Sequence, residues 1–322
     1  MKKHKNGGRL FGIFNLNRDR LYDAVEEDTS PTLKRYFKLL GRKFWRLISV
    51  NLMMLPMLIP ILLAVYFYLS SDTTPIENTP LFSQLYGAGL IDATPASTML
   101  LDIFGAQLNI PVYDNTTTYV IIGIAIGFLV ITFGWQNVGI SYILRNMVRG
   151  EPVFIFSDYF YAIKRNLKQG FLMGLLDFII LFLLGFNYLY YSSMPSSFWI
   201  DFCYFAILLI AILYFFMRLY LYLMLVTFEL SIRKILKNAL IFSVLGIKRS
   251  IMALLGIIVI SALQFFLFSV LGMAIPLILM LLYYLGITSF TCAYAAYPTI
   301  ERYMIDPYLD ELTQKEDEES EA

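Results

Sequence analysis

Six long apolar segments set the pattern of this chain. Each has at least 20 residues and few or no charged side chains within it. A helix rises 1.5 Å per residue, so about 20 residues cross the roughly 30 Å hydrocarbon core of a bilayer. Backbone groups in hydrocarbon must be paired within the segment, which favours helices, and nothing here alternates like a β-barrel strand. The expected spans are Leu47–Leu69, Thr118–Leu144, Gln169–Tyr191, Phe202–Val226, Ile251–Leu271 and Leu277–Tyr297.

The pattern therefore predicts an all-α, polytopic membrane protein with six transmembrane helices. Composition agrees, because 58% of the 322 residues are hydrophobic and only 15% are charged. Soluble domains carry about 25% charged residues, so a set of water-soluble domains is excluded. Three parts are expected: a basic arm at 1–46, a membrane domain at 47–297 with an outer loop at 71–117, and an acidic tail at 298–322.

The basic residues predict the orientation of the spans. All Lys and Arg residues except Arg218 lie in the arm, in the second–third and fourth–fifth connections, or in the tail. The opposite connections, at 71–117, 192–197 and 272–276, contain none. By the positive-inside rule, both termini are expected in the cytoplasm and the protein in the cell membrane.

Each basic segment is also amphipathic. Apolar side chains recur at helical spacing in Leu33–Ile48, Phe156–Lys168 and Ser231–Arg249, with basic side chains on the other faces. Such helices lie in the membrane interface and are attracted to the anionic headgroups of the inner leaflet. Each precedes an odd-numbered span, which suggests three membrane hairpins, each led by one cytoplasmic interfacial helix.

Basic pairs mark the same three places: Arg42-Lys43, Lys164-Arg165 and Lys248-Arg249. They are consistent with an internal repeat of three units. They are equally consistent with the general tendency of a span that enters from the cytoplasm to begin with Lys or Arg. The sequence leaves both interpretations open.

Two ionisable residues lie well inside the spans. Asp177 comes nine residues after Lys168, or about 13 Å along a helix. Arg218 lies on the neighbouring antiparallel span at a similar depth. Charges inside a membrane are costly, which makes these two residues candidates for a substrate or proton site. The alternative is a salt bridge that pairs two helices, or an arginine that extends toward the interface.

Known catalytic motifs are absent from the sequence. It has no P-loop, no nucleotide-binding glycine pattern, no zinc-protease helix and no serine elbow. Its one histidine, His4, lies in the basic arm, and Cys203 and Cys292 have the character of small core residues. We therefore expect a protein that is not an enzyme, with no catalytic residue, cofactor, metal site or nucleic-acid partner.

The connection after the second span has a recognisable sequence. It reads Gly139-Ile140-Ser141-Tyr142-Ile143-Leu144-Arg145-Asn146-Met147-Val148-Arg149-Gly150-Glu151, then Phe156-x-Asp158-Tyr159-Phe160 and Lys164-Arg165-Asn166-Leu167-Lys168-Gln169. This stretch resembles the YesL-like family of uncharacterised bacterial membrane proteins. Members of that family are often encoded beside carbohydrate-uptake transporter components and glycan-degrading enzymes. The resemblance implies a role in sugar uptake or its regulation, with no reaction and no ligand.

The same stretch contains a candidate turn for cytoplasmic interactions. Arg145 and Arg149 lie one helical turn apart at the inner end of a span. Gly150 can adopt the left-handed conformation that ends a helix, and Glu151 follows it.

Two hypotheses follow from these features. The first is an accessory, scaffold or regulatory component of bacterial carbohydrate uptake, which binds transporter subunits through its interfacial helices. The second is a small-solute transporter or channel with a site near Asp177 and Arg218. A water-lined cavity that reaches Asp177 would favour transport, and a close-packed bundle would favour the scaffold. Whether the chain forms a homo-oligomer stays open.

Overall fold

The computed structural model describes residues 31–71, 89, 94–96, 98–99 and 116–307. In these parts the chain is helical and has no strand. The chain divides into two compact units, Leu58–Leu129 and the remaining residues on either side of it, and each is considered by itself. The first 30 residues of the predicted arm, most of the predicted outer loop and the tail from residue 308 lie outside the described residues.

Six helical segments are long and apolar enough to span a membrane, which confirms the predicted fold class. Each overlaps a predicted span, and most extend beyond it by a few residues. They are α3 (Phe44–Leu69), α6 (Thr116–Val148), α8 (Leu167–Ser192), α9 (Phe198–Thr227), α11 (Ile247–Leu271) and a final segment, Ala274–Ile305.

The final segment is longer than its sequence suggests. It consists of α12 (Ala274–Leu279), the π-helical turn η1 (Met280–Tyr284), α13 (Leu285–Ile300) and a second π-helical turn, η2 (Glu301–Ile305). The predicted tail from residue 298 is therefore helical at its start, even though Pro298 lies inside α13. Burial explains this, because Thr299 and Ile300 are packed in the core just after the proline.

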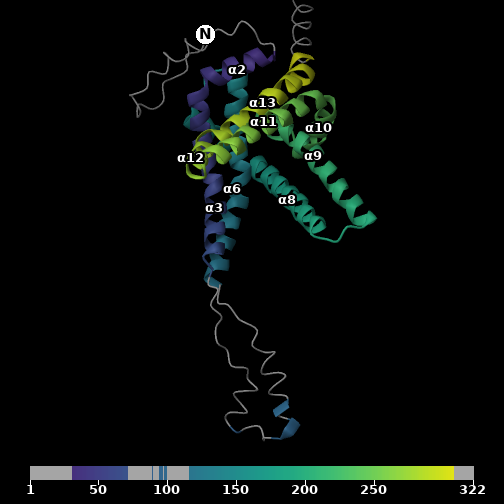
Figure 1. The fold of residues 1–322 in the computed structure, drawn as a ribbon. Coiled ribbons are helices and arrows are strands. Elements are labelled where there is room, and N and C mark those ends of the chain that lie inside the picture. Colours follow the sequence, from purple (N-terminus) through teal and green to yellow (C-terminus); the bar gives the residue numbers. More distant parts are fainter. Residues whose placement is uncertain (1–30, 72–88, 90–93, 97, 100–115, 308–322) are drawn as a thin grey trace, which may run out of the picture. The chain divides into compact units, whose positions relative to one another are not determined.

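A short helix precedes the first, third and fifth spans, as the amphipathic pattern predicts; the first and the last of these short helices are labelled in Figure 1 as α2 and α10. These helices are α2 (Leu33–Arg42), α7 (Ile155–Arg165) and α10 (Ile232–Leu245). Each turns its apolar face inward, where Leu39, Ala162 and Ala239 are fully buried. We call the adjoining ends of the spans the basic end.

A single residue separates each short helix from its span: Lys43, Asn166 or Gly246. These three residues share one backbone conformation, with φ of −102°, −116° and −92° and ψ of 13°, 26° and 19°. Each donates its N–H to the carbonyl four residues before it and accepts from the N–H four residues after it. The helical hydrogen bonds therefore continue through each bend, and the three units have the same local structure.

The basic pairs were expected to mark the same position in each of the three units, but the structure places them at different positions. The pair Arg42-Lys43 lies at its bend, whereas Lys164-Arg165 comes just before the second bend and Lys248-Arg249 comes after the third. The bend, rather than the basic pair, is what the three units have in common.

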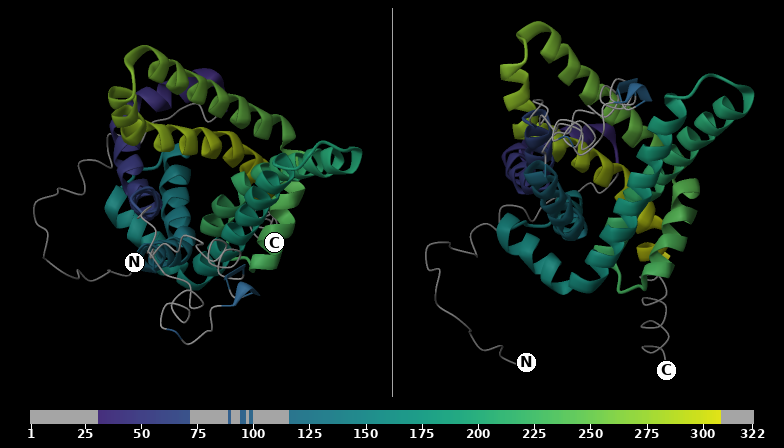
Figure 2. Two further views of the ribbon diagram at one scale, coloured as in Figure 1. Left: turned by 60° about the horizontal axis from the view of Figure 1, so that its bottom comes forward. Right: turned by 90° about the horizontal axis from the view of Figure 1, so that it is seen from below.

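Two of the three expected hairpins are visible in the packing. Figure 2 shows α8 beside α9 and α11 beside α13, and α13 also contacts α9. A hairpin of α3 with α6 stays a prediction. The largest fully buried side chains gather toward the basic end, among them Tyr220, Met224, Phe290, Leu47 and Met147.

Glycines allow α6 and α8 to cross closely. A methyl group at Gly134 would lie 2.7 Å from the Cα of Gly174, and one at Gly174 would overlap the backbone of Gly134. Small residues at such crossings let membrane helices approach and gain van der Waals contact. The approach brings the buried face of α8, which carries Asp177, against α6.

We expect Gly174→Ala to lower the free energy of unfolding by about 1–3 kcal/mol, because the methyl group forces the two backbones apart. Thermal unfolding of the purified protein in detergent measures this as a lower midpoint temperature. Gly185→Ala is the matched control on the same helix, since its methyl group meets nothing within 4 Å. Equal midpoints for the two variants would contradict the crossing.

Candidate functional site

Asp177 lies on the buried face of α8. Helical spacing puts it on the same side as Gly170, Met173 and Gly174, all of which are buried. Its side chain is 0% exposed. A carboxylate in such a place must be neutralised by groups of the protein itself.

Three side chains of α9 surround this carboxylate. Arg218 donates its Nε–H to both oxygens, at 3.1 Å to Oδ1 and 2.9 Å to Oδ2. The hydroxyl of Tyr214 donates to Oδ1 and that of Tyr222 to Oδ2, each at 2.7 Å. The three donors are four residues apart, so one face of α9 presents them all. Together they fill the roughly four acceptor positions of the carboxylate.

Arg218 extends the cluster to a third helix. Its Nη2 donates to Oδ1 of Asn137 on α6 at 3.3 Å, and Asn137 in turn donates to the carbonyl of Phe133 at 2.8 Å. The guanidinium carbon lies 5.7 Å from the ring centre of Phe133 and 5.8 Å from that of Tyr222. One ion pair thus connects α6, α8 and α9.

Two hollows lie beside Arg218, whose side chain is 31% exposed. One has a volume of about 110 Å³ and includes the polar side chains of Asn137, Ser141 and Ser289. The other, of about 330 Å³, is mostly apolar and lies between α8 and α9. Neither is lined by Asp177. Arg218 is therefore accessible to a small polar ligand from these hollows, whereas Asp177 is enclosed by protein.

The structure places the two sequence-predicted residues, Asp177 and Arg218, in one ion pair of 2.9 Å. Sequence reasoning missed Tyr214 and Tyr222. The available signal was their position four residues on either side of Arg218, which requires them to share its helix face.

The predicted turn at the end of α6 has the geometry of a Schellman motif. Gly150 has a φ of +81°, which favours glycine. The N–H of Gly150 donates to the carbonyl of Met147 at 3.3 Å, and that of Glu151 to the carbonyl of Asn146 at 2.9 Å. Gly150 is thus the left-handed residue that ends the helix.

Arg145 and Arg149, expected to act together in this turn, point to different surroundings. Arg145 is buried and donates from Nη1 to the carbonyl of Val226 at 2.7 Å, at the C-terminal end of α9. Arg149 forms an ion pair of 3.1 Å with Glu151, and both side chains are about 40% exposed. Only Arg149, Gly150 and Glu151 therefore remain accessible for an interaction.

Basic side chains of α2 and of the bend after it meet the end of α6 in a similar way. Lys43 is buried and donates from Nζ to the carbonyl of Met147 at 3.0 Å. Arg35 donates to the carbonyl of Val148 at 3.2 Å. The last carbonyls of a helix lack partners within it and carry partial negative charge, so basic side chains stabilise them.

Asp158 helps to begin α7. Its carboxylate accepts the N–H of Phe154, the residue just before the helix, at 2.8 Å. Burial raises the pKa of Asp158, and the hydrogen bond from Phe154 opposes that rise. Next to it, burial raises the pKa of the Tyr159 hydroxyl to about 12.

The bend between α7 and α8 borders a larger polar hollow of about 710 Å³, which we call the basic groove. Residues 164–169 form one side and residues 225–231, at the end of α9, form the other. Lys164, Arg165 and Lys168 line it, and Arg165 pairs with the exposed Glu229 at 2.9 Å.

These features define a multi-helix membrane protein with an intramembrane ion pair, whose carboxylate is enclosed, and with a basic groove at its basic end. A family model described as "Protein of unknown function, DUF624" matches residues 116–188. The match covers α6, α7 and most of α8, including Asp177 and the Arg149–Glu151 turn, and it ends before Arg218. Comparison with curated proteins and comparison with solved structures give no match.

We expect Tyr222→Phe and Tyr214→Phe each to lower the free energy of unfolding by about 1–3 kcal/mol. Each change removes one donor from the buried carboxylate of Asp177 and leaves part of its charge unpaired. Thermal unfolding in detergent measures the effect. Tyr190→Phe, at an exposed position on the same helix as Asp177, is the control and should change the midpoint little. Midpoints that all match the unmodified protein would show that the hydroxyls do not stabilise Asp177.

Proposed function

We propose that this chain is a non-enzymatic accessory or scaffold protein of a bacterial carbohydrate-uptake system. In this proposal it binds a transporter subunit through the basic groove. The observation that carries the proposal is the position of this groove, which is solvent-accessible, polar and lined by Lys164, Arg165 and Lys168. The association with carbohydrate uptake rests on the resemblance to the YesL-like family.

The charge of the groove favours an acidic segment as the partner. Among the described residues, Arg165 is paired with Glu229, while Lys164 and Lys168 are exposed and form no ion pair. Complementary charge steers association and disfavours partners of the same sign. The positive-inside rule supports a cytoplasmic position for the groove, where the cytoplasmic parts of a transporter are within reach.

The closed state of Asp177 supports a binding role over a chemical one. Its carboxylate already accepts from Arg218, Tyr214 and Tyr222, so it has little capacity left for a substrate or a transferred proton. Close packing of α6, α8 and α9 around this carboxylate favours a rigid scaffold, in which the binding surface at the ends of these helices keeps one shape.

A second candidate function is a small-solute transporter or channel, which one observation favours. Arg218 reaches the hollow of about 110 Å³ beside Asn137, Ser141 and Ser289. A guanidinium has five N–H donors, and Arg218 uses only some of them on Asp177 and Asn137. A small polar or anionic solute is the ligand that this hollow would suit.

Affinity purification of the full chain from its native membrane tests the first proposal. The unmodified protein should recover transporter subunits, and Lys164→Glu with Lys168→Glu should lose most of them because the groove then repels an acidic segment. Lys234→Glu with Lys237→Glu makes the same charge change on exposed positions of α10 and should keep them. Recovery of no transporter subunit, or equal recovery by both double variants, would refute the proposal.

Flux measurements in proteoliposomes separate the two candidates. The scaffold proposal expects the uptake of sugars, ions and amino acids to equal that of empty liposomes. Uptake by the unmodified protein that disappears in Ser141→Phe, which fills the hollow beside Arg218, would instead favour transport.

A further inference from the structure

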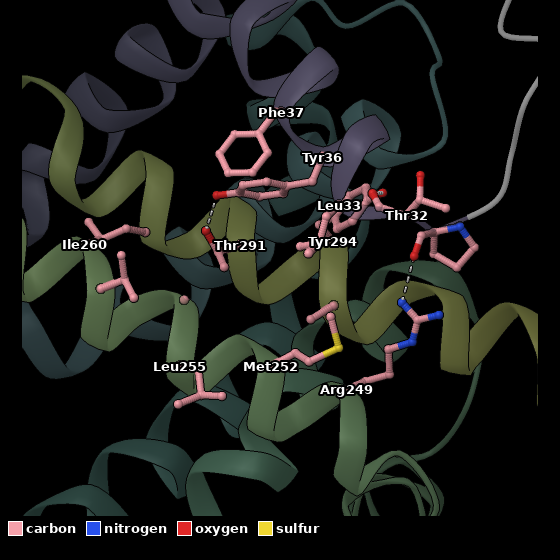
Figure 3. Close-up of a pocket in the computed structure, with 14 residues that line it drawn as sticks. Thr32, Leu33, Tyr36, Phe37, Arg249, Met252, Leu255, Ile260, Thr291 and Tyr294 are labelled. Atoms are coloured by element: carbon pink, nitrogen blue, oxygen red, sulfur yellow. Dashed lines mark hydrogen bonds between the residues drawn. The ribbon is translucent and has the colours of Figure 1, made fainter.

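A second groove lies at the basic end, between α2, α11 and α13. It has a volume of about 410 Å³, within the range of ligand-binding sites in proteins. Figure 3 shows Tyr36 and Phe37 of α2 over one side, Met252 and Leu255 of α11 over the other, and Thr291 of α13 between them. We call it the lateral groove.

The body of the lateral groove is apolar. The hydroxyls of Tyr36 and Thr291 are hydrogen-bonded to each other at 2.8 Å, and Tyr294 donates to the carbonyl of Thr32 at 2.7 Å. These polar atoms are therefore satisfied within the wall. The exposed side chains of Leu255 and Val259 continue the apolar surface outward. A ligand that lies along this surface must itself be apolar, because the wall has few polar groups to offer it.

One end of the lateral groove carries a positive charge. Arg249 lies two residues inside α11, and its Nη1 donates to the carbonyl of Pro31 at 3.3 Å (Figure 3). A guanidinium has five N–H donors in a planar fork that suits phosphate, so this single bond leaves donors for a ligand. Lys34 and Lys248 adjoin lining residues and are exposed.

The length of the lateral groove matches one leaflet of a bilayer. From Arg249 to Ile260 the lining follows α11 over 12 residues, and the 11 steps between them make about 16 Å of helix. Half of a hydrocarbon core of about 30 Å is about 15 Å. With Arg249 at the level of the headgroups, the apolar part would extend through the hydrocarbon of the inner leaflet.

We propose that the lateral groove binds one anionic phospholipid of the cytoplasmic leaflet, with its phosphate on Arg249 and one acyl chain between α2 and α11. Arginine binds phosphate through paired, charge-assisted hydrogen bonds. The adjoining lysines favour a headgroup with net negative charge over a zwitterionic one. Such a lipid would hold α2 against α11 and α13, in addition to any role of the basic groove.

Native mass spectrometry of the full chain with added phosphatidylglycerol or phosphatidylcholine tests this site. We expect one retained phosphatidylglycerol, bound about tenfold more tightly than phosphatidylcholine. Arg249→Gln should weaken that binding about tenfold, or about 1.4 kcal/mol, and Arg249→Lys should weaken it less. Lys237→Gln removes one positive charge from an exposed position of α10, which does not line the lateral groove, and should change binding less than twofold.

A second pair of variants tests the acyl-chain part and leaves Arg249 in place. Val259→Trp fills the lateral groove and should abolish the retained lipid, whereas Val270→Trp adds the same bulk at an exposed position of α11 that does not line it. Equal binding of the two lipids, no retained lipid at all, equal effects of Arg249→Gln and Lys237→Gln, or equal effects of the two tryptophan variants would overturn the proposal.

Discussion

Hydrocarbon offers no hydrogen-bond partner, so each charge and each helix end inside this bundle must be satisfied by the protein itself. Asp177 shows the consequence most fully, because Arg218, Tyr214 and Tyr222 all donate to one buried carboxylate. These contacts require α8 and α9 to present particular faces to each other. Through Asn137 they also set the position of α6. The close helix crossing at Gly134 and Gly174 lies on the same face of α8.

The same requirement explains what the basic residues do at the helix ends. Lys43 and Arg35 donate to the last carbonyls of α6, and Arg145 donates to the end of α9. These basic residues thus stabilise the ends of the long helices. The bends at Lys43, Asn166 and Gly246 keep the helical hydrogen bonds intact, so each short helix can turn into the long helix that follows without an unpaired carbonyl at the bend residue. The three short helices thus lie at the basic end of the spans, beside the basic groove and the lateral groove.

Features that depend on local pattern could be predicted from the sequence. The six long apolar helices follow from apolar length, the three short amphipathic helices from the spacing of their apolar residues, and the shared depth of Asp177 and Arg218 from counting residues along helices. Features that depend on how helices rotate against one another could not. Tyr214 and Tyr222 join the cluster because of the rotation of α9, and Arg145 is buried because the end of α9 lies beside it. The span was expected to end at Tyr297, but the helix continues past Pro298, where Ile300 is buried.

The central claim is that Asp177 and Arg218 form a structural pair, in which each charge is tolerated inside the bundle because the other one neutralises it. A double-mutant cycle of thermodynamic stability, with Asp177→Leu, Arg218→Met and both together, tests it most directly. Removing one member of a buried pair costs about 3–5 kcal/mol, whereas replacing both with apolar residues costs far less. The claim predicts a double variant that is more stable than either single variant. A double variant that loses the sum of the two single effects would contradict it.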